Sequence, residues 1–437
     1  MIKIVSREDL KRLKRAGAET EEPLSAVQEI IDLVRKKGDE ALRTFTLQFD
    51  GADVQKWEVG PEEMEEAMEQ ADPALVRVLT EAARRIRKFH EHQRQQSWFF
   101  TEEDGTVLGQ KVAPLEKVGV YVPGGKAAYP SSVLMNVIPA KTAGVDEVIM
   151  VTPPLENGKV YETTLVAAKI AGADRIFRVG GAQAVAALAY GTESIPRVDK
   201  IVGPGNVYVA LAKRAVFGQV DIDSIAGPSE IVVLADELAD PVYVAADLLS
   251  QAEHDRMASA VCITPSRDLA ERVAEEVERQ CRRLPRREIA EASIKSFGAV
   301  CLVKDMEEAV STANQLAPEH LELMVRDPWH WLAKIKHAGA VFLGEHSPEP
   351  VGDYWAGPNH VLPTSGTARF FSPLSVDQFV KKTSVISYSP EALYRDGDKV
   401  MYLAEAEGLT AHAESVRVRL TKKREGEGIG ENRETDE

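Results

Sequence analysis

The segment from Asp221 to Asp255 holds the residues that are best placed for chemistry in this chain. It opens with a tight Gly227–Glu230 turn, and the apolar, β-branched run Ile231–Ala235 that follows predicts a buried strand. Further on, Gln251 and His254 lie one turn apart on one face of a predicted helix. An amide oxygen and an imidazole nitrogen at that spacing can share a metal ion or one polar ligand.

The helix that carries this pair is predicted from its start signal and its two stripes. Asp240 is a typical N-cap, and Pro241 is a typical first helical residue. The apolar stripe consists of Ala245, Leu248, Leu249 and Ala252. The polar stripe opposite it consists of Asp247, Gln251 and His254. Because an ordinary surface helix shows the same two stripes, the pattern alone leaves open whether the polar face is a site or a solvated surface.

The second chemically suggestive stretch is Ala317–Leu321, which reads Ala-Pro-Glu-His-Leu. Pro318 should end the preceding helix, which places Glu319 and His320 in the turn before a strand. Successive strand residues point to opposite faces, so only a turn can aim both side chains into one pocket. A histidine that titrates near neutrality can remove a hydroxyl proton, and a neighbouring carboxylate can orient a water. An exposed pair at a loop is the alternative.

A long segment from Gly344 to Pro373 is rich in Pro and Gly and has no regular period. Loops of this length in compact proteins are usually functional or disordered. The functional option is favoured by the side chains of Asp353, Tyr354, Asn359, His360 and Arg369. By contrast, His90 and His92 lie among charged residues and are predicted to belong to a solvated helix face.

Four predicted strands end in Gly or Pro, which is typical of α/β sheets that bind a nucleotide. They cover residues 118–122, 147–152, 175–180 and 200–203, and their exits read VPGGK, TPP, VGGAQ and VGPGN. Such turns let backbone N–H groups approach phosphates beyond the carboxyl ends of strands. The full dinucleotide fingerprint, GxGxxG with an acidic residue about twenty positions later, is absent. The glycines can equally be plain turn residues.

Composition narrows the class of protein. The chain has 437 residues, of which 44% are hydrophobic and 28% charged, as in a soluble globular protein of two or more domains. A formal net charge of −16 argues against a nucleic-acid or anionic membrane partner and favours small molecules. No signal peptide or membrane span is predicted, and three cysteines without CxxC spacing fit a reducing cytoplasm.

The alternation of strands and helices from residue 118 onward predicts an α/β fold with parallel sheets. A second run of strands is predicted at residues 230–235, 258–264, 297–303, 321–325 and 340–343. The first 96 residues are predicted to be mostly helical, and short amphipathic helices are predicted after Ser389. The C-terminal helices are too thin for a core of their own, so they should pack on another domain or a partner subunit.

Four stretches together resemble the histidinol dehydrogenase family. They are Ile225–Asp255 with its GPSEI turn and LLSQAEHD helix end, the APEHL stretch, VGDYWAGPNHVLPT at residues 351–364, and AEGLTAHAESV at residues 406–416. Ordered matches spread over nearly the whole chain are far more specific than any single short motif. Only the polar tail is left uncovered.

The resemblance implies two Rossmann-like, doubly wound α/β domains. The expected division is an N-terminal helical segment at 1–20, a larger α/β domain at 21–117 plus 229–374, a Rossmann-like domain at 118–228, a helical dimerisation extension at 375–423 and a disordered tail at 424–437. The larger domain would carry the Glu-His pair.

The resemblance also implies roles for individual residues. Zinc would be held by Gln251, His254, Asp353 and His412. Besides these four, the substrate would contact Ser229, His320, His360 and Glu407. Glu319 and His320 would be the catalytic acid/base pair. Tyr121, Gln183 and Asn206, each at a Gly-rich strand exit, would bind NAD. Glu407 and His412 would reach the site from the other subunit of an interlocked homodimer.

The implied reaction is the four-electron oxidation of L-histidinol to L-histidine through a bound aldehyde, with two NAD consumed. Two other functions compete with it: a relative of the same fold that oxidises another polar alcohol, such as a sulfonated diol, and a zinc hydrolase that needs no redox cofactor. The Gly-rich strand exits argue against the hydrolase. A non-catalytic nucleotide-binding module would leave the Gln, His, Asp and Glu-His set without a purpose.

Cys262 and Cys301 raise the question of a thiol nucleophile, which many aldehyde oxidations use. Both lie inside apolar strand runs, so buried structural cysteine is the better interpretation. Replacing them with alanine should leave turnover within a few fold.

Overall fold

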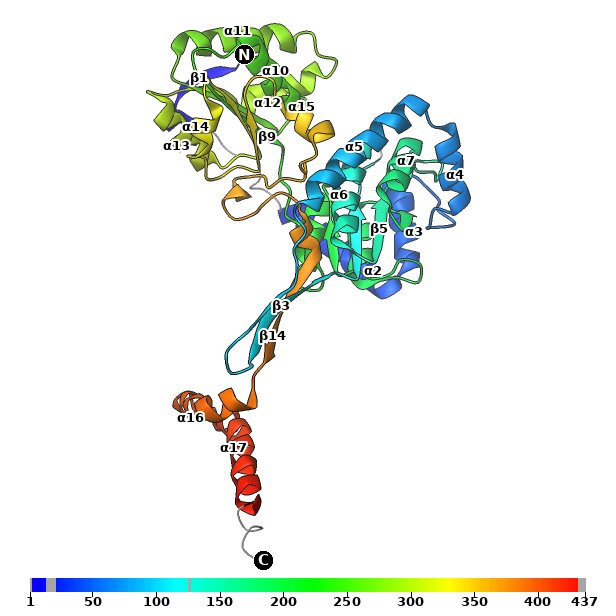
Figure 1. The fold of residues 1–437 in the computed structure, drawn as a ribbon. Coiled ribbons are helices and arrows are strands. Elements are labelled where there is room, and N and C mark those ends of the chain that lie inside the picture. Colours follow the sequence, from blue (N-terminus) through cyan, green and yellow to red (C-terminus); the bar gives the residue numbers. More distant parts are fainter. Residues whose placement is uncertain (1, 13–20, 125–126, 431–437) are drawn as a thin grey trace, which may run out of the picture. The chain divides into compact units, whose positions relative to one another are not determined.

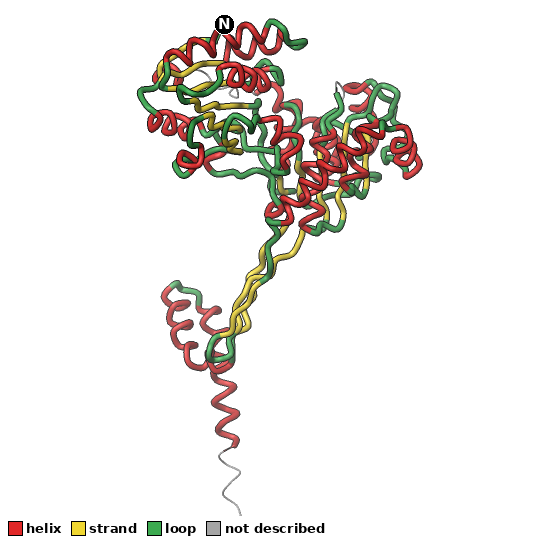
Figure 2. The backbone as a smooth tube through the Cα atoms, turned by 45° about the horizontal axis from the view of Figure 1, so that its top comes forward, coloured by secondary structure: helices red, strands yellow, loops and turns green. Residues whose placement is uncertain are grey.

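The structure is a computed structural model that describes residues 2–12, 21–124 and 127–430. The chain divides into two compact units. The first comprises Met1–Arg94 and Pro114–Phe379, and the second comprises Gln95–Ala113 and Val380–Glu437. The first unit contains two parallel sheets whose strands are flanked by helices, as Figures 1 and 2 show.

One sheet of the first unit has five parallel strands. They are β4 (Lys117–Tyr121), β5 (Glu147–Thr152), β6 (Arg175–Arg178), β7 (Lys200–Val202) and β8 (Asp221–Ile222), in the order β6-β5-β4-β7-β8. Numbered within the sheet, this is the 3-2-1-4-5 order of a Rossmann-like fold, with its switch point between β4 and β7. The four predicted strands are confirmed, and the short β8 is additional.

Helices cover both faces of this sheet. They are α2 (Glu21–Lys37), α3 (Asp39–Asp50), α4 (Pro61–Gln70), α5 (Pro73–Glu91), α6 (Pro130–Ala143), α7 (Glu162–Ala171), α8 (Gly181–Tyr190) and α9 (Val207–Val216). The face that contains Tyr121 packs against α2, α3, α8 and α9, and the opposite face packs against α5, α6 and α7. Helices α2–α5 therefore share the core of the five-stranded sheet, which differs from the expected grouping of residues 21–117 with 229–374.

The other sheet of the first unit has six parallel strands. They are β1 (Lys3–Ser6), β9 (Glu230–Ala235), β10 (Ser259–Thr264), β11 (Gly298–Leu302), β12 (His320–Met324) and β13 (Ala340–Leu343), in the order β1-β11-β10-β9-β12-β13. Without β1 the order is again 3-2-1-4-5. The predicted N-terminal helical segment is wrong for residues 3–6, because this short run, with Ile4 and Val5 at its centre, pairs with β11 at the sheet edge. Residues 13–20 lie outside the described residues.

Helices also cover both faces of the six-stranded sheet. They are α1 (Arg7–Arg12), α10 (Pro241–Ala252), α11 (Arg267–Cys281), α12 (Arg287–Phe297), α13 (Met306–Leu316) and α14 (Pro328–Leu332). Helices α10, α11 and α12 share a core with Ile231 and Met324, whereas α13 shares a core with Leu321 and Leu323 on the other face (Figure 1). The doubly wound α/β architecture predicted from the sequence is confirmed for both sheets.

The predicted irregular loop after β13 contains only short turns of helix. They are α15 (Glu349–Val351), the π-helical turn η1 (Gly352–Ala356) and the 3₁₀ turn η2 (Thr367–Arg369); a further 3₁₀ turn, η3 (Val376–Phe379), follows the loop. The loop is held by buried contacts. Asn359 donates from Nδ2 to the carbonyl of Met135 on α6 at 2.6 Å, and the Thr364 hydroxyl accepts from Gly227 N at 2.6 Å. The loop is therefore packed and carries fixed side chains.

The second unit contains a three-stranded sheet and two helices. They are β2 (Trp98–Thr101), β3 (Val107–Pro114), β14 (Val380–Ser387), α16 (Pro390–Ala406) and α17 (Thr410–Gly430), with strand order β14-β3-β2. The expected helical extension at 375–423 is therefore partly a strand, and it pairs with residues 107–114, far away in the sequence. The expected disorder is wrong for residues 424–430, which continue α17, whereas 431–437 lie outside the described residues. Among the described residues, none of the helices combines the length and apolar character that a membrane span requires.

Candidate active site

Glu319 lies in the turn that leads into β12, and His320 is the first residue of that strand. Ala317 ends α13 in the left-handed conformation with φ of 48°, and Pro318 follows it. The Glu319 carboxylate accepts a hydrogen bond from Glu230 N at 2.8 Å, and His320 Nδ1 lies 3.0 Å from the carbonyl oxygen of Glu230. The start of β9 thus fixes both side chains. The two side chains do lie together, with 3.6 Å between His320 Nδ1 and Glu319 Oε2, but the predicted turn holds only Glu319, because β12 begins one residue earlier than expected.

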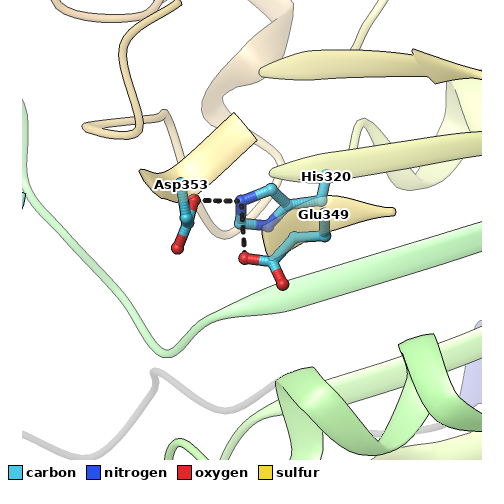
Figure 3. Close-up of side chains that lie close together, drawn as sticks. All are labelled: His320, Glu349 and Asp353. Carbon is cyan, nitrogen blue, oxygen red and sulfur yellow. Dashed lines mark ion pairs between the residues drawn. The ribbon is translucent and has the colours of Figure 1, made fainter. Parts of the chain in front are cut away.

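Bonding of Nδ1 to a carbonyl means that Nδ1 carries a proton and that Nε2 faces the site. Nε2 lies 3.8 Å from Asp353 Oδ1 and 3.9 Å from Glu349 Oε1, and Figure 3 shows the imidazole between these two carboxylates. Burial alone would lower the pKa of His320, but the surrounding carboxylates outweigh it and raise the pKa to about 10. The ring therefore lies where a substrate proton can be taken once that negative charge is partly neutralised.

Glu349 is the first residue of α15 and Asp353 lies in η1, one helical turn later. Burial would raise the pKa of Asp353, but the neighbouring imidazoles of His320 and His360 lower it to about 2. Burial, followed by the charge of Asp353, raises the pKa of Glu349. One ligand atom from each of His320, Glu349 and Asp353 lies within 4.8 Å of the others, which is a spacing that can hold a metal ion. Of these three, only Asp353 belongs to the predicted zinc set.

Gln251 and His254 lie at the end of α10. The predicted cap is confirmed, because the Asp240 side chain accepts from Val242 N and Pro241 is the first helical residue. Gln251 is 0% exposed, and neither polar atom of its side chain has a partner among the described residues. His254 reaches the surface, yet its surroundings desolvate the ring and lower its pKa, and the carboxylate of Asp353 acts on it. Two residues of the polar stripe of α10, Asp247 and Gln251, are buried, so this face of the helix is not a solvated surface at these positions.

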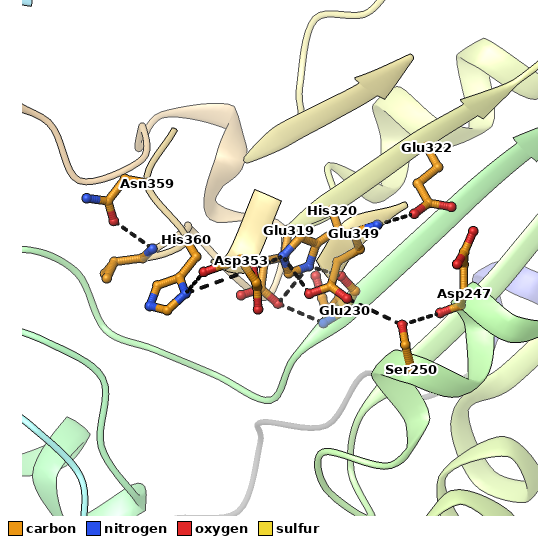
Figure 4. Close-up of polar contacts among 11 residues, drawn as sticks. Glu230, Asp247, Ser250, Glu319, His320, Glu322, Glu349, Asp353, Asn359 and His360 are labelled. Atoms are coloured by element: carbon orange, nitrogen blue, oxygen red, sulfur yellow. Dashed lines mark hydrogen bonds and ion pairs between the residues drawn. The ribbon is translucent and has the colours of Figure 1, made fainter. Parts of the chain in front are cut away.

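His360 and Ser229 are the remaining predicted substrate contacts in the first unit. His360 Nδ1 lies 3.2 Å from the carbonyl oxygen of Asp353 and 4.0 Å from its carboxylate (Figure 4). Burial lowers the pKa of His360 and favours the neutral ring. Ser229 is half-buried directly before β9. The structure thus gathers Glu319, His320, Asp353 and His360 around one point.

Glu407 and His412 lie in the second unit. Glu407 caps the end of α16, and His412 lies in the first turn of α17, where its backbone N donates to Leu409 O at 3.0 Å. Both side chains are exposed. The two residues are therefore available to a partner surface.

The predicted cofactor residues lie at the carboxyl edge of the five-stranded sheet. The Tyr121 hydroxyl accepts from Gly181 N at 3.1 Å, which joins the end of β4 to the start of α8. Gln183 is buried on α8, and its amide has no hydrogen-bond partner within the part of the chain that the structure describes. Asn206 caps α9 by accepting from Tyr208 N and Val209 N. Gly125 and Lys126 of the VPGGK exit lie outside the described residues.

Comparison with known proteins identifies the family. The family model described as histidinol dehydrogenase matches residues 13–420. The chain belongs to the histidinol dehydrogenase family. It is 58% identical to a histidinol dehydrogenase of Halalkalibacterium halodurans over 97% of this chain and 100% of that protein, and 56% identical to one of Bacillus subtilis over 96% and 98%. A crystal structure of histidinol dehydrogenase from Elizabethkingia anophelis matches with a TM-score of 0.92 and 35% identity, covering 97% of this chain and 99% of that one.

Membership of the histidinol dehydrogenase family makes this protein an oxidoreductase. The family assignment from the four motif stretches is confirmed, as is the mixed α/β fold. The cysteines fit the expectation that they are structural. Cys262 and Cys301 are buried free thiols on β10 and β11, and burial raises their pKa values to about 12 and about 11.

Sequence reasoning missed several buried polar residues around this site. Glu349 lies four residues before Asp353, and Glu322 lies two residues after His320 on the same face of β12, so both spacings were visible in the sequence.

His90 was predicted to be solvated, yet it is 0% exposed. Its spacing from Ile86 continues the apolar stripe of α5, and its Nδ1 bonds the Ile86 carbonyl at 2.8 Å. The prediction was wrong because the charged residues next to His90 in the sequence lie on the solvated face of α5, whereas His90 lies on its buried face.

Proposed function

We propose that the protein oxidises L-histidinol to L-histidine in two successive hydride transfers to NAD, through an aldehyde that stays bound. The observation that carries this proposal is the buried Glu319–His320 pair, with Asp353 and His360 beside it, in a chain whose family is named for this activity. Each oxidation removes a hydride and a proton, and one water enters between them, so one substrate yields two NADH.

His320 is the base in both oxidations in this proposal. Its Nδ1 proton is committed to the Glu230 carbonyl, which leaves Nε2 to take the hydroxyl proton of the alcohol and later that of the aldehyde hydrate. Glu319 activates the water that adds to the aldehyde. Burial raises the pKa of Glu319 to about 7, so this carboxyl group can accept and release a proton near neutral pH.

A zinc ion is part of the proposal because the residues fit it. The amide of Gln251 is buried without a partner among the described side chains and main chain, and the cost of leaving a polar group so is offset when it binds a ligand. Gln251, His254 and Asp353, with His412 from a second copy, supply oxygen and nitrogen donors that suit zinc. A bound zinc ion would anchor the imidazole and amine of the substrate. Its charge would also offset that of Asp353, which would lower the pKa of His320 toward neutrality, where the ring can act as a base.

NAD is proposed to bind at the carboxyl edge of the five-stranded sheet. The support is the meeting of strand exits there: Tyr121 bonds Gly181, and the buried amide of Gln183 has no partner in the described chain. Gly203 has φ of 112°, and a side chain there would clash with the backbone of Tyr121. These close turns leave backbone N–H groups at the start of α8, where the positive end of the helix favours a phosphate.

A homodimer completes the proposed site. The second unit exposes large apolar side chains, which a lone subunit would leave in water. They are Trp98, Phe99, Phe100, Ile386, Tyr402, Leu403 and Leu409, of which Tyr402 is 74% exposed. Because Glu407 and His412 lie on the same unit, we propose that dimerisation delivers them to the site of the partner subunit. We place the enzyme in the cytoplasm, since its three cysteines are free thiols.

The test is NADH formation from L-histidinol and NAD by the purified protein, before and after chelation. We expect two NADH per histidinol, loss of activity on chelation, and recovery with zinc. No NADH from histidinol in folded, zinc-loaded protein would overturn the substrate assignment, and NADH from a sulfonated diol would replace it with the same-fold alternative. Substrate hydrolysis without NADH would replace it with a zinc hydrolase.

A further inference from the structure

Glu322 is a buried carboxyl group to which the proposed reaction gives no role. It lies two residues after His320 on β12, so both side chains point to the face that packs against α10. Its side chain is 1% exposed. The Oε1 atom accepts from Glu349 N at 2.8 Å, which fastens the start of α15 to the strand (Figure 4).

The side chain of Glu322 also neighbours a second carboxyl group, that of Asp247 on α10. Its Oε2 atom is buried and has no donor among the described residues. Two carboxylates cannot bond each other, so one proton must lie between them. Burial, followed by the charge of Asp247, raises the pKa of Glu322 to about 9, and burial raises that of Asp247 to about 6. A proton held by Glu322 and donated to Asp247 would satisfy both side chains.

These two bonds join the three elements that carry the candidate site. β12 carries His320, α10 carries Gln251 one turn after Asp247, and α15 leads to Asp353 one turn after Glu349. A second link runs in parallel, since the Ser250 hydroxyl lies 2.8 Å from the Asp247 carbonyl and 3.3 Å from Glu349 Oε2.

We propose that Glu322 is a positioning residue, which donates to Asp247 and accepts from Glu349 N and thereby sets the spacing between His320 and the Gln251 and Asp353 ligands. This inference rests on the proposed function and deepens it. It explains why a site that already holds several acidic groups keeps one more carboxyl group behind them, at a position where an apolar side chain would pack without desolvation cost.

The proposal predicts a difference between two substitutions of similar size. In Glu322→Gln, the amide N–H can donate to Asp247 and the amide oxygen can accept from Glu349 N, so the variant copies the protonated acid. In Glu322→Met, both bonds are lost. We expect kcat and zinc affinity of Glu322→Gln to stay within about threefold of the parent, and both to fall at least about tenfold in Glu322→Met, because small misplacement of catalytic groups is costly.

Asp236 provides a matched control. It is a buried carboxylate that follows β9, at the carboxyl ends of β9 and β12 and thus away from His320. There it accepts from Leu238 N at 3.0 Å and Arg326 N at 2.7 Å. Asp236→Leu also removes a buried acceptor of backbone N–H groups, so it should lower the midpoint of thermal unfolding. Its kcat should nevertheless stay within about threefold of the parent. A kcat of Glu322→Met within threefold of the parent, or a loss in Glu322→Gln as large as that in Glu322→Met, overturns the proposal.

Infrared spectroscopy reads the shared proton directly and does not depend on activity. The difference spectrum between the parent and Glu322→Gln at neutral pH should contain the carbonyl band of a protonated carboxyl group. Its absence overturns the proposal even if Glu322→Met fails to fold. If the parent forms no NADH from histidinol, the proposed function fails, whereas the infrared band and the zinc affinities still decide the role of Glu322.

Discussion

Glu319 shows how the surroundings of a single residue can suit it to the role proposed for it. The carboxylate is buried directly before β12 and accepts a hydrogen bond from Glu230 N. Burial raises the pKa of this group to about 7, whereas Asp353, surrounded by two imidazoles, keeps its charge. The surroundings therefore favour different charge states for two carboxyl groups of one candidate site, a pattern that is common where acid/base chemistry occurs.

Glu319→Gln should separate the two oxidations. The amide keeps the size of the side chain but cannot take a proton from water, so the aldehyde should form and its hydration should slow by about 10²–10⁴-fold. In a single turnover with excess enzyme, one NADH per histidinol should appear rapidly and the second slowly. Two NADH at the parental rate would exclude Glu319 as the group that activates water.

The cysteines should prove dispensable. A thiol with a pKa of about 12, as burial gives Cys262, supplies almost no thiolate at neutral pH. Turnover of the Cys262→Ala and Cys301→Ala variants should stay within a few fold of the parent, with a modest loss of stability from the cavities. A loss of several decades in turnover, with folding intact, would instead favour a thiohemiacetal route.

His90 should make the protein less stable in mild acid. Burial lowers the pKa of His90 in the folded state below its unfolded value of 6.5, and its Nε2 lies 3.3 Å from Asn359 Nδ2, which requires the neutral ring. The unfolded chain therefore binds a proton that the folded chain refuses. Stability is complete above pH 6.5 and is lost as pH falls through the folded pKa, by about 1.4 kcal/mol per unit of lowering.

Urea unfolding of the parent and His90→Gln at pH 8 and pH 5.5 measures this effect. His90→Gln should be less stable than the parent at pH 8, because the packing is disturbed, but should lose less stability between the two pH values. An equal loss in the two proteins would show that the titration of His90 is not responsible. The comparison between variants cancels the titration of other groups.

At the scale of elements, the proposed cofactor residues lie at the carboxyl edge of one parallel sheet, and the proposed catalytic pair lies at the amino edge of the other. The proposed NAD residues follow the carboxyl ends of β4, β6 and β7, as expected for a Rossmann-like sheet. The Glu319–His320 pair instead lies at the amino ends of β9 and β12, where His320 opens its strand. The α10 end that carries Gln251 also lies toward this edge, because the helix runs antiparallel to the strand before it.

A buried ion pair holds one of the strand exits at the cofactor edge. Lys213 on α9 pairs with Asp223 after β8, and both side chains are 3% exposed. Lys213 Nζ donates to the Gly203 carbonyl at 3.0 Å, and Asp223 accepts from Gly203 N at 2.8 Å. The pair thus binds both polar backbone groups of a residue that must be glycine.

Lys213→Met should destabilise the protein by about 3–5 kcal/mol, because it leaves a buried carboxylate without its partner. The double variant Lys213→Met/Asp223→Leu should recover part of that loss in stability, while the KM for NAD should rise in both variants because the Gly203 turn is released. Denaturant unfolding and initial rates at varied NAD measure the two effects. An unchanged KM would place this turn away from the cofactor.

The elements were predictable from the sequence to within a few residues, but their partners were not. Short apolar runs between Gly and Pro gave the strands of both sheets, since periodicity and turn residues are local. The apolar stripe of α5 says that one face is buried, but it does not say against which sheet, which is why the helices of residues 21–94 were misassigned. Likewise, β14 was overlooked because its partner, β3, lies far away in the sequence.

The candidate site was predictable where chemistry and family resemblance met, as at Glu319 and His320. What escaped was the layer behind it. Glu322 and Asp247 carry no motif, and their burial depends on α10 and α15 closing over β12, which is a tertiary contact. Charged residues are usually exposed, so sequence reasoning places such residues in solvent.

At the scale of the whole molecule, the proposed site is shared between two copies of the chain. Each site would take Glu319 and His320 from one subunit and Glu407 and His412 from the other. Two inactive variants should then complement each other. In a heterodimer of His320→Asn with His412→Asn, one site carries both substitutions and the other carries neither.

Mixing the two variants under conditions of subunit exchange should therefore restore about a quarter of the parental activity, since half of the dimers are mixed and each has one intact site of two. Each variant alone should stay inactive, and a mixture of His320→Asn with Glu319→Gln should gain no steady-state turnover beyond that of Glu319→Gln itself, because both residues come from the same subunit. If His412 served its own chain, the first mixture would contain no intact site and would recover nothing. The exposed positions of Glu407 and His412, on a unit that also exposes Tyr402 and Leu403, favour recovery.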